Sequence, residues 1–274
     1  MSLLKELDQF FTEKQTVSAC LLTLEKHLDK KNVEWIEPSA GAGSFIEGAY
    51  EMGFGYPKVA FDIMPQHKMV KKSDFLKENL VDVFSENSKI KLFLGNPPFG
   101  KNSSLAIKFF NHMSKSKADL IAMVLPATFS KNSIKNKLDL NFVLIEELNL
   151  GNIDFLFGLE KRKVPVVFQI WKRSNTKRKK VVEKTVSIFF DFVTKDEGDF
   201  AIQRVGAAAG KVKLEFKEAS PNSHYFIKVK SENVLEVFKK INWDKVKYKT
   251  AGNPSIAKTE LVREFEIKFA DEKI

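Results

Sequence analysis

Ile90-Lys91-Leu92-Phe93-Leu94-Gly95 leads directly into Asn96-Pro97-Pro98-Phe99-Gly100, so a short apolar run is followed at once by a proline-rich loop. Apolar runs that end at Gly and Pro are typical of buried strands that stop abruptly. In open α/β sheets, ligands bind beyond the carboxyl ends of the strands. We therefore expect a strand over 90–95 and a ligand-binding loop over 96–100.

The residues of this loop suit one kind of ligand. The Asn96 amide offers a carbonyl acceptor, and Pro97 leaves its backbone carbonyl free beside it. Two prolines, Pro97 and Pro98, fix the loop so that both acceptors converge, and Phe99 adds a flat aromatic face. The set favours a planar ring that carries an exocyclic amino group. A stiffened turn with Phe99 in the core explains the loop about equally well.

A second loop lies upstream, between an expected strand at 33–36 and a helix that begins near Ser44. Small residues and two glycines let a backbone approach a ligand closely, and the amino end of the helix points at the same place. Glu37 opens the loop and is a candidate partner for a ligand ammonium group, although a surface acid near a helix end is the plainer explanation. The loop reads Glu37-Pro38-Ser39-Ala40-Gly41-Ala42-Gly43.

Two further acids follow apolar segments. Asp62, near the end of an expected strand at 58–63, lies about 20 residues beyond the glycines, where dinucleotide-type folds bind ribose hydroxyls. Asp74 is a candidate acceptor for an adenine amino group, with Ile63 or Phe75 covering the ring. A helix cap is an almost equally good interpretation of Asp74.

Composition narrows the class of protein. The 274 residues suffice for one large domain, or for a core with a small appendage. The net charge of +10 and pI near 9.4 favour a polyanionic partner such as nucleic acid. Cys20 is the only cysteine, and the four histidines show no ligand spacing, so we expect neither disulfides within the chain nor a metal site. With no membrane-length apolar run and an acidic amino terminus, we expect a cytoplasmic protein.

Strands and helices alternate up to residue 171, which predicts a mostly parallel α/β sheet. The last two strands of this part, at 142–148 and 164–171, have no clear helix between them and are expected to form an antiparallel hairpin at one edge. Residues 175–274 are expected to form a small α+β appendage, with strands at 186–192, 200–205 and 224–229. A basic run over 172–184 is typical of a solvated linker and is also suited to facing phosphates.

Taken together, the motifs resemble the S-adenosylmethionine-dependent DNA adenine-N6 methyltransferases of the gamma motif order, within the Asn-Pro-Pro-Phe amino-methyltransferase superfamily. The resemblance covers roughly residues 8–171 and is carried by the glycine loop at 37–43 and the Asn-Pro-Pro-Phe loop at 96–99. Asp8-Gln9-Phe10-Phe11-Thr12 is similar to the family's amino-terminal aromatic-Thr motif, and the order of motifs is that of the gamma group. It implies a Rossmann-like methyltransferase sheet, an S-adenosylmethionine cofactor and a DNA substrate.

The resemblance also implies a role for each site residue. Phe10, Phe11 and Thr12 would help to hold the methionine end of the cofactor, Glu37 would meet its ammonium group, and the loop Pro38, Ser39, Ala40, Gly41 and Gly43 would form that pocket. Asp62 would bind the ribose, and Asp74, with Ile63 and Phe75, the adenine of the cofactor. Asn96 and the Pro97 carbonyl would accept both N6 hydrogens of the target adenine, while Pro98 stiffens the loop and Phe99 stacks on the base. The catalytic domain would span 1–174, and 175–274 is a candidate for nucleic-acid target recognition.

Several alternatives stay open. Adenine in RNA presents the same amino group, and single-stranded bases stack on aromatics without a cost for flipping. Protein glutamine methylation usually employs Asn-Pro-Pro-Tyr, and N4-cytosine methylation more often shows Ser in place of Asn96. A nucleic-acid-binding module without activity is the rival from another class.

The tail leaves questions of its own. Its segments at 200–206, 223–227 and 252–256 look similar to segments of small bacterial and phage members of the superfamily, without an assigned chemistry. The tail is short for the target-recognition domain of a restriction-modification enzyme, so a separate specificity partner is an open option. The sequence does not reveal an oligomeric state.

Overall fold

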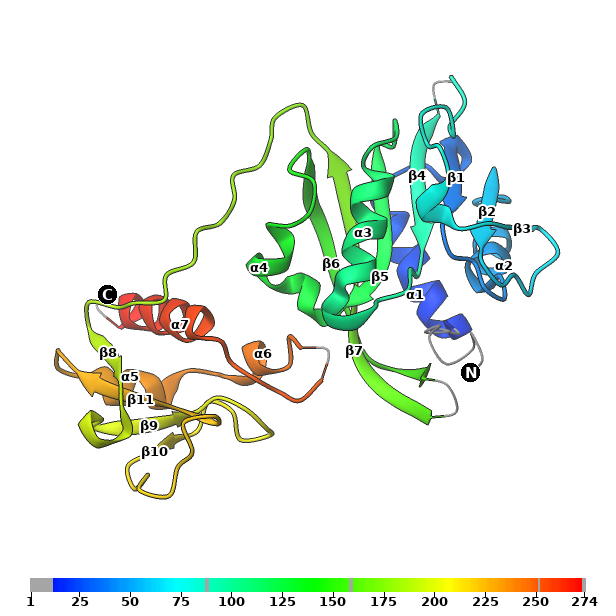
Figure 1. Cartoon of the computed structure of the whole chain (residues 1–274). Coiled ribbons are helices and arrows are strands. Elements are labelled where there is room, and N and C mark those ends of the chain that lie inside the picture. Colours follow the sequence, from blue (N-terminus) through cyan, green and yellow to red (C-terminus); the bar gives the residue numbers. More distant parts are fainter. Residues whose placement is uncertain (1–11, 87–88, 158–159, 251, 273–274) are drawn as a thin grey trace. The chain divides into compact units, whose positions relative to one another are not determined.

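A computed structural model describes residues 12–86, 89–157, 160–250 and 252–272 (Figure 1). The chain divides into two compact units, Met1–Lys180 and Val181–Ile274, called here the N-terminal and C-terminal units. The helices of the N-terminal unit are α1 (Lys14–Leu24), α2 (Ser44–Glu51), α3 (Ser104–Met113) and α4 (Asn132–Lys135). Its strands are β1 (Val33–Glu37), β2 (Val59–Asp62), β3 (Val70–Lys72), β4 (Ile90–Gly95), β5 (Leu120–Pro126), β6 (Phe142–Phe157) and β7 (Glu160–Arg173).

The seven strands form one sheet in the order β3-β2-β1-β4-β5-β7-β6. The first five pair in parallel, whereas β7 runs antiparallel to both β5 and β6. This is the Rossmann-like sheet, mostly parallel with an antiparallel hairpin at one edge, that the sequence predicts. Within the hairpin, β6 is the edge strand, and the reversed strand β7 lies one place further in. The hairpin also continues past Pro126, the last residue of β5, to the pair Phe157 and Glu160.

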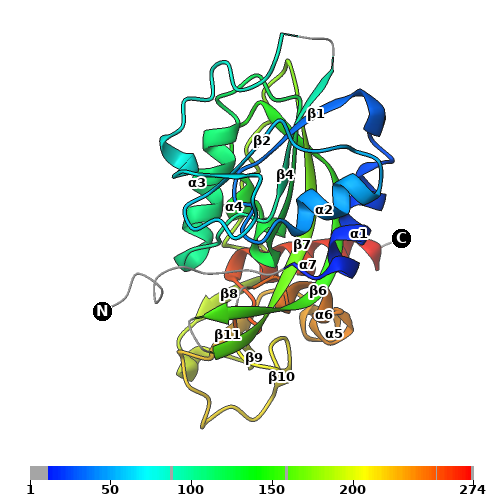
Figure 2. The ribbon, with the colours of Figure 1, turned by 90° about the vertical axis from the view of Figure 1, so that its right-hand side faces the viewer.

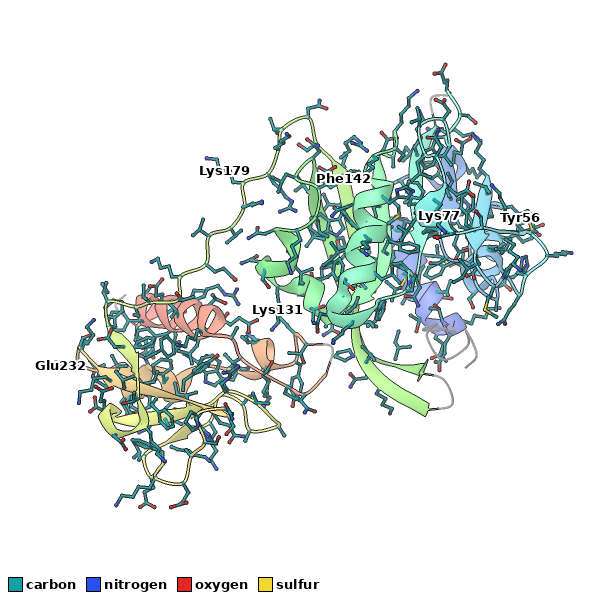
Figure 3. The ribbon with its side chains drawn as sticks, in the orientation of Figure 1. Tyr56, Lys77, Lys131, Phe142, Lys179 and Glu232 are labelled. Atoms are coloured by element: carbon teal, nitrogen blue, oxygen red, sulfur yellow. The ribbon has the colours of Figure 1, made fainter. Side chains whose placement is uncertain are left out.

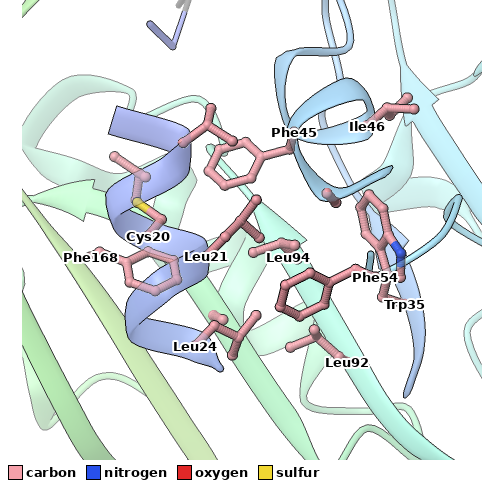
Figure 4. Packing of buried hydrophobic residues seen from close by; sticks show 14 of the residues in the cluster. Cys20, Leu21, Leu24, Trp35, Phe45, Ile46, Phe54, Leu92, Leu94 and Phe168 are labelled. Atoms are coloured by element: carbon pink, nitrogen blue, oxygen red, sulfur yellow. The ribbon is translucent and has the colours of Figure 1, made fainter. Parts of the chain in front are cut away.

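The central strands bury both of their faces, which explains their nearly continuous apolar sequences. Successive residues point to opposite faces, so Trp35 enters one hydrophobic cluster and Ile36 the other. Helices α1 and α2 cover the first face, and α3 and α4 lie across the second (Figure 2). Figure 4 shows the first cluster, in which Leu21 of α1 and Phe45 of α2 lie with Leu94 of β4. The sheet is therefore the middle layer of three.

The structure corrects several of the predicted element boundaries. The sequence of residues 132–140 predicts a helix, but in the structure α4 ends at Lys135, because Lys137 and Leu138 close successive turns onto Ile134 and Lys135. The strand expected at 142–148 continues to Phe157, since its partner β7 is long enough to extend the ladder. The sequence of residues 3–30 predicts a helical segment interrupted over 8–12, and in its described part the structure has an α-helix from Lys14 to Leu24.

Part of the basic run at 172–184 has a structural role. The Arg173 side chain donates to the carbonyls of Ser114, Ser116 and Ala118, at 2.9, 2.7 and 2.7 Å. Arg178 donates to the carbonyls of Lys135, Leu138 and Phe142. Lys177, Lys179 and Lys180 are exposed (Figure 3 labels Lys179). The two arginines therefore tie the linker to the N-terminal unit, and these three lysines are open to solvent.

The C-terminal unit has an antiparallel sheet in the order β10-β9-β11-β8. Its strands are β8 (Phe190–Val193), β9 (Phe200–Gln203), β10 (Val212–Lys213) and β11 (His224–Val229), and its helices are α5 (Val234–Lys240), α6 (Asp244–Lys247) and α7 (Lys258–Asp271). The strand expected at 186–192 was wrong over 186–189, where Val186 and Ile188 lie exposed without ladder partners. Helices α5 and α7 contribute Phe238 and Phe265 to the core on one face of the sheet. No helix in the described ranges has the length and apolar character needed to span a membrane.

We expect Gly48→Ala to lower the free energy of unfolding by about 1–2 kcal/mol, although alanine is the better helix former. A Cβ at Gly48 of α2 would lie 2.5 Å from Cγ1 of the buried Val17 of α1, so the two helices would have to separate. Chemical denaturation measures the effect. In a Val17→Ala background the same substitution should cost less, and an equal cost in both backgrounds would contradict this account of the packing.

Candidate functional site

Parallel pairing places three of the predicted site residues at one edge of the sheet. β1 pairs with β2 through Glu37 and Ala60, and with β4 through Ile36 and Phe93. The carboxyl ends of these strands carry Glu37, Asp62 and, one residue past β4, Asn96. Because the strands run in the same direction, residues far apart in the sequence meet at this edge.

Glu37 is buried and only partly satisfied. Its side chain is 2% exposed, and its Oε2 atom has no hydrogen-bond partner. Burial, with a smaller contribution from the nearby carboxylate of Asp62, raises the pKa of Glu37 well above its usual value. Gly95 packs against it so closely that a Cβ there would lie 3.2 Å from Cγ of Glu37. A buried acid with an open oxygen is suited to receiving a cationic ligand group.

Asn96 is held by two hydrogen bonds that leave its side-chain oxygen open. Its Nδ2 donates to Oγ1 of the buried Thr12 at 3.1 Å, and the Ser39 hydroxyl donates to its backbone carbonyl at 3.0 Å. Its Oδ1 is buried without a partner. Among the described residues, none donates a hydrogen bond to the carbonyl of Pro97. Both acceptors that the sequence predicts in this loop are therefore available to a ligand.

The glycine loop depends on backbone conformations that side chains disfavour. Gly41 and Gly43 have φ values of +50° and +82°. Asp62 braces the loop by accepting the Gly41 N–H at Oδ2 and the Met64 N–H at Oδ1, both at 2.8 Å. Each carboxylate oxygen accepts more than one hydrogen bond, so these contacts leave Asp62 capacity for a ligand.

A pocket opens between the glycine loop and the Asn-Pro-Pro-Phe loop. Five of the predicted residues line it: Thr12, Glu37, Ser39, Ala40 and Asn96. It also includes three residues that the sequence analysis did not assign, namely Ala42, Ser44 and Phe45. Ala42 stands between the two glycines and Ser44 begins α2, so their positions in the motif were the available signal. No signal in the sequence pointed to the Phe45 side chain as part of the wall.

The remaining predicted residues lie elsewhere or play other parts. Asp74 caps a short 3₁₀ turn by accepting the Leu76 N–H and pairs with Lys77 at 3.3 Å (Figure 3 labels Lys77), and it does not line the pocket. Phe75 is in the core, with its ring 5.4 Å from that of Phe109. Ile63 is 43% exposed, which makes it the more accessible of the two candidate ring covers.

The Asn-Pro-Pro-Phe loop and the amino-terminal motif complete the set. Pro38 and Pro97 are buried, Pro98 is partly exposed, and Phe99 is 6% exposed within the core cluster that includes α1. Phe10 and Phe11 lie outside the described residues. Within the described ranges, no group of His, Cys, Asp and Glu side chains has an arrangement suited to a metal ion.

Compared with models of known families, the chain matches none, and a comparison with curated proteins finds no match. Among solved structures it is similar to a Pyrococcus horikoshii protein ascribed RNA methyltransferase activity, at 16% identity and a TM-score of 0.45, over 64% of this chain and 90% of that one. It is also similar to a type I restriction-modification methyltransferase subunit from Streptococcus thermophilus, at 13% identity and a TM-score of 0.43, over 85% of this chain and 53% of that one.

A third likeness is to the M protein of the type I restriction enzyme EcoKI, at 12% identity and a TM-score of 0.43, over 96% of this chain and 71% of that one. All three proteins are described as methyltransferases or as subunits of restriction enzymes. With TM-scores below 0.5, these likenesses carry no argument about function, which must come from the site itself.

We expect Glu37→Gln to raise the thermal stability of the free protein at neutral pH. A raised pKa means that the folded state binds the proton of Glu37 more tightly than the unfolded state does. This contribution is fully present below the unfolded-state pKa and is lost as the pH rises through the folded-state pKa. The Tm advantage of the glutamine variant over the wild type should therefore widen from pH 5 to pH 8, which calorimetry measures.

Glu34, on the same strand, provides the matched control. Burial alone would raise its pKa, but hydrogen bonds from Ser85 and the charges of Lys58 and Lys89 outweigh that effect and lower it. Its stabilising contribution is present above the unfolded-state pKa and is lost as the pH falls through the folded-state pKa. Glu34→Gln should therefore lower the Tm at neutral pH. Equal Tm shifts of the same sign in the two variants would contradict the assignment of a raised pKa to Glu37 and a lowered pKa to Glu34.

Proposed function

We propose that the N-terminal unit transfers a methyl group from S-adenosylmethionine to the N6 amino group of adenine in DNA. One observation carries the proposal: two hydrogen-bond acceptors, Oδ1 of Asn96 and the carbonyl of Pro97, are adjacent in the chain and lack donors among the described residues. An exocyclic amino group supplies two N–H donors, which is the complement of such a pair. The order of the motifs along the chain supports adenine in DNA as the target.

The residues beside this loop fit the cofactor. The open Oε2 of Glu37 is a buried acceptor suited to the ammonium of its methionine part, and Gly41 and Gly43 allow close approach of the backbone. Asp62 keeps acceptor capacity for the ribose hydroxyls. When bound, the cofactor supplies an electrophilic methyl group on a sulfonium. The ionised form of Glu37 is the one that pairs with a cation, so cofactor binding should release a proton at pH values below its raised pKa.

The chain contributes positioning and electrostatic stabilisation. Target adenine must leave the base stack or come from a single strand to reach a buried site. Asn96 and Pro97 then accept both N6 hydrogens and orient the nitrogen lone pair toward the methyl group. As the nitrogen formed its bond to the methyl carbon, the carbon–sulfur bond of the sulfonium would break, and the two oxygens would stabilise the positive charge on the nitrogen more in the transition state than in the ground state. No strong base is required, because the methylated nitrogen is acidic and loses its proton readily.

Thr12 acts through Asn96 rather than on the base. By accepting from Nδ2, its hydroxyl fixes which end of the amide faces the pocket, so that Oδ1 rather than the NH₂ group is presented. Ser39 holds the backbone of the same residue in place. If the Asn96 amide were turned the other way, its NH₂ group would face the amino group of the base. The acceptor on which the reaction depends would then be lost.

The first experiment is methyl transfer from labelled S-adenosylmethionine to duplex DNA, single-stranded DNA and RNA in parallel, followed by nucleoside analysis. N6-methyladenine in DNA is the expected product. Label in RNA alone would mean that the substrate is RNA rather than DNA, since adenine in RNA presents the same amino group. Label in neither, with cofactor binding intact, would reject the proposal and redirect the search to protein substrates, glutamine side chains first.

Asn96→Ala should reduce kcat by about 10²–10³, which corresponds to roughly 3–4 kcal/mol for one lost transition-state acceptor. Cofactor affinity should change little, because Glu37 and the glycine loop remain. Single-turnover transfer and equilibrium binding measure the two effects separately. Asn32→Ala, the same change at an exposed amide on a different loop, serves as the control. Retained turnover in Asn96→Ala would overturn the mechanism.

Thr12→Val should lower kcat by about fivefold at saturating cofactor, in line with the loss of one buried hydrogen bond worth roughly 1 kcal/mol. Thr12→Ser keeps the hydroxyl and should restore most of the rate. The discriminating readout is the split between kcat and the cofactor Kd. A rise in Kd with kcat unchanged would assign Thr12 to the cofactor alone and remove its role in orienting Asn96.

A further inference from the structure

Three segments of the tail that the sequence analysis left without chemistry meet at one residue of the C-terminal unit, Arg204. Its backbone N–H donates to the Ser223 carbonyl at 2.9 Å, and its carbonyl accepts from the Ile256 N–H at 2.8 Å. The next residue, Val205, forms a bridge with Ser255. The segments at 200–206, 223–227 and 252–256 are thus parts of one structural feature. In Figure 1 they lie where β9, β11 and the start of α7 come together.

The Arg204 side chain points to the same place. Its guanidinium carbon lies 5.0 Å from the ring centroid of Tyr225, a ring held in place by the hydrogen bond from its hydroxyl to the Ile256 carbonyl at 3.1 Å. A second cation, Lys258, has its Nζ 6.0 Å from the same centroid and 4.7 Å from that of Phe192. Two positive charges are therefore gathered around a pair of aromatic rings whose centroids are 5.3 Å apart.

In the described part of the chain neither cation forms an ion pair, although the charge of Glu260 acts on Tyr225 together with that of Arg204. Eight other cations of this unit are paired: Arg263 with Glu183 and Glu264, and lysines 184, 228, 230, 239, 240, 247 and 268 each with an acid. Arg204 makes no side-chain hydrogen bond, and its Nε is a buried donor without an acceptor. The acid on the same helix turn, Glu260, is buried and accepts the Ala257 N–H.

The position of Lys258 also goes against the local electrostatics. It is the first residue of α7, and a cation is disfavoured at the positive end of a helix dipole. Glu260, an acid in the same first turn, offsets part of this cost, and a bound anion would offset more of it. The exposed Lys211 follows the small-residue loop Gly206-Ala207-Ala208-Ala209-Gly210, in which Ala207 and Ala208 are exposed and Ala209 and Gly210 are buried. An anionic group bound here would meet Arg204, Lys258 and the positive end of α7 together.

We propose that Arg204 and Lys258, set around Tyr225, form a phosphate-binding site through which the C-terminal unit holds the phosphodiester backbone of the nucleic acid. The inference rests on the proposed function, which supplies the polymer. Net charge does not carry it, because residues 181–274 contain 17 basic against 15 acidic residues. The gathering of two cations without ion-pair partners around the rings of Tyr225 and Phe192 carries it.

The test compares two double variants that each remove two positive charges. Arg204→Gln/Lys258→Gln removes the site, and Lys230→Gln/Lys239→Gln removes two lysines that are paired with Asp191 and Glu236. Fluorescence anisotropy measures the affinity of the full chain for labelled duplex DNA, single-stranded DNA and RNA of one sequence over a range of salt. We expect at least a tenfold loss in the first variant and less than threefold in the second. On duplex DNA, the slope of log K against log salt should fall by about 1.8 in the first variant, since each phosphate contact contributes about 0.9.

A charge-preserving variant, Arg204→Lys/Lys258→Arg, keeps the result interpretable if the neutral variant folds poorly, and it should bind within threefold of the wild type. Thermal unfolding checks each fold. Equal losses in the two neutral variants, or a full loss in the charge-preserving one, would overturn the phosphate site. Either result with methyl transfer by the wild type intact leaves the proposed function standing. Absence of binding by the wild type to all three polymers would reject both.

Discussion

The parallel pairing of β1 with β4 is the constraint on which the candidate site depends. It brings together Glu37 and Asn96, which are separated by almost sixty residues, because each follows or ends a strand that runs toward the same edge. Hydrogen bonds then secure the edge. Asp62 accepts from the Gly41 and Met64 N–H groups, the Ser39 hydroxyl donates to the Asn96 carbonyl, and the Asn96 side-chain amide donates to the Thr12 hydroxyl. Each of these bonds joins one loop of the edge to another or braces it, so the loops form a single arrangement rather than independent turns.

That arrangement leaves two buried oxygens without partners, Oε2 of Glu37 and Oδ1 of Asn96. An unsatisfied buried acceptor costs about 1–3 kcal/mol, a large fraction of the stability of a folded protein. Stability alone would favour apolar or paired residues at both positions. The unit has a well-packed core on either face of its sheet, which offsets such a local cost. A site for a ligand with several N–H donors requires unsatisfied acceptors close together, and these two oxygens lie in one pocket.

The sequence alone was sufficient to predict the sheet class, the edge hairpin, the strand end at Gly95 and, to within one residue, the ends of β1 at Glu37 and of β2 at Asp62, since these depend on local apolar runs. It could not decide contacts between distant segments. The hydrogen bond from Asn96 to Thr12 spans 84 positions. Phe75 follows Asp74 in a pattern that suits a ring cover equally well, and only the packing of Phe61, Phe93 and Phe109 around it places it in the core. Arg173 and Arg178 read as solvated charges because the carbonyls that they bind belong to other elements.

The cations of the two units differ in what neutralises them, and the difference separates structural charges from candidate binding charges. Arg173 and Arg178 are satisfied by backbone carbonyls, and Arg263 by two glutamates, so these three hold elements together. Arg204 has an aromatic face beside its guanidinium and no ion-pair partner among the described residues, so the ring orients the charge without neutralising it. Stacking leaves the charge available while restricting its motion, so less conformational entropy is lost when an anion binds. A cation fixed in this way on a nearly neutral unit is better suited to holding one phosphate in a defined place than to attracting a polyanion from a distance. The N-terminal unit is better suited to attracting a polyanion from a distance, because it contains 28 basic and 20 acidic residues.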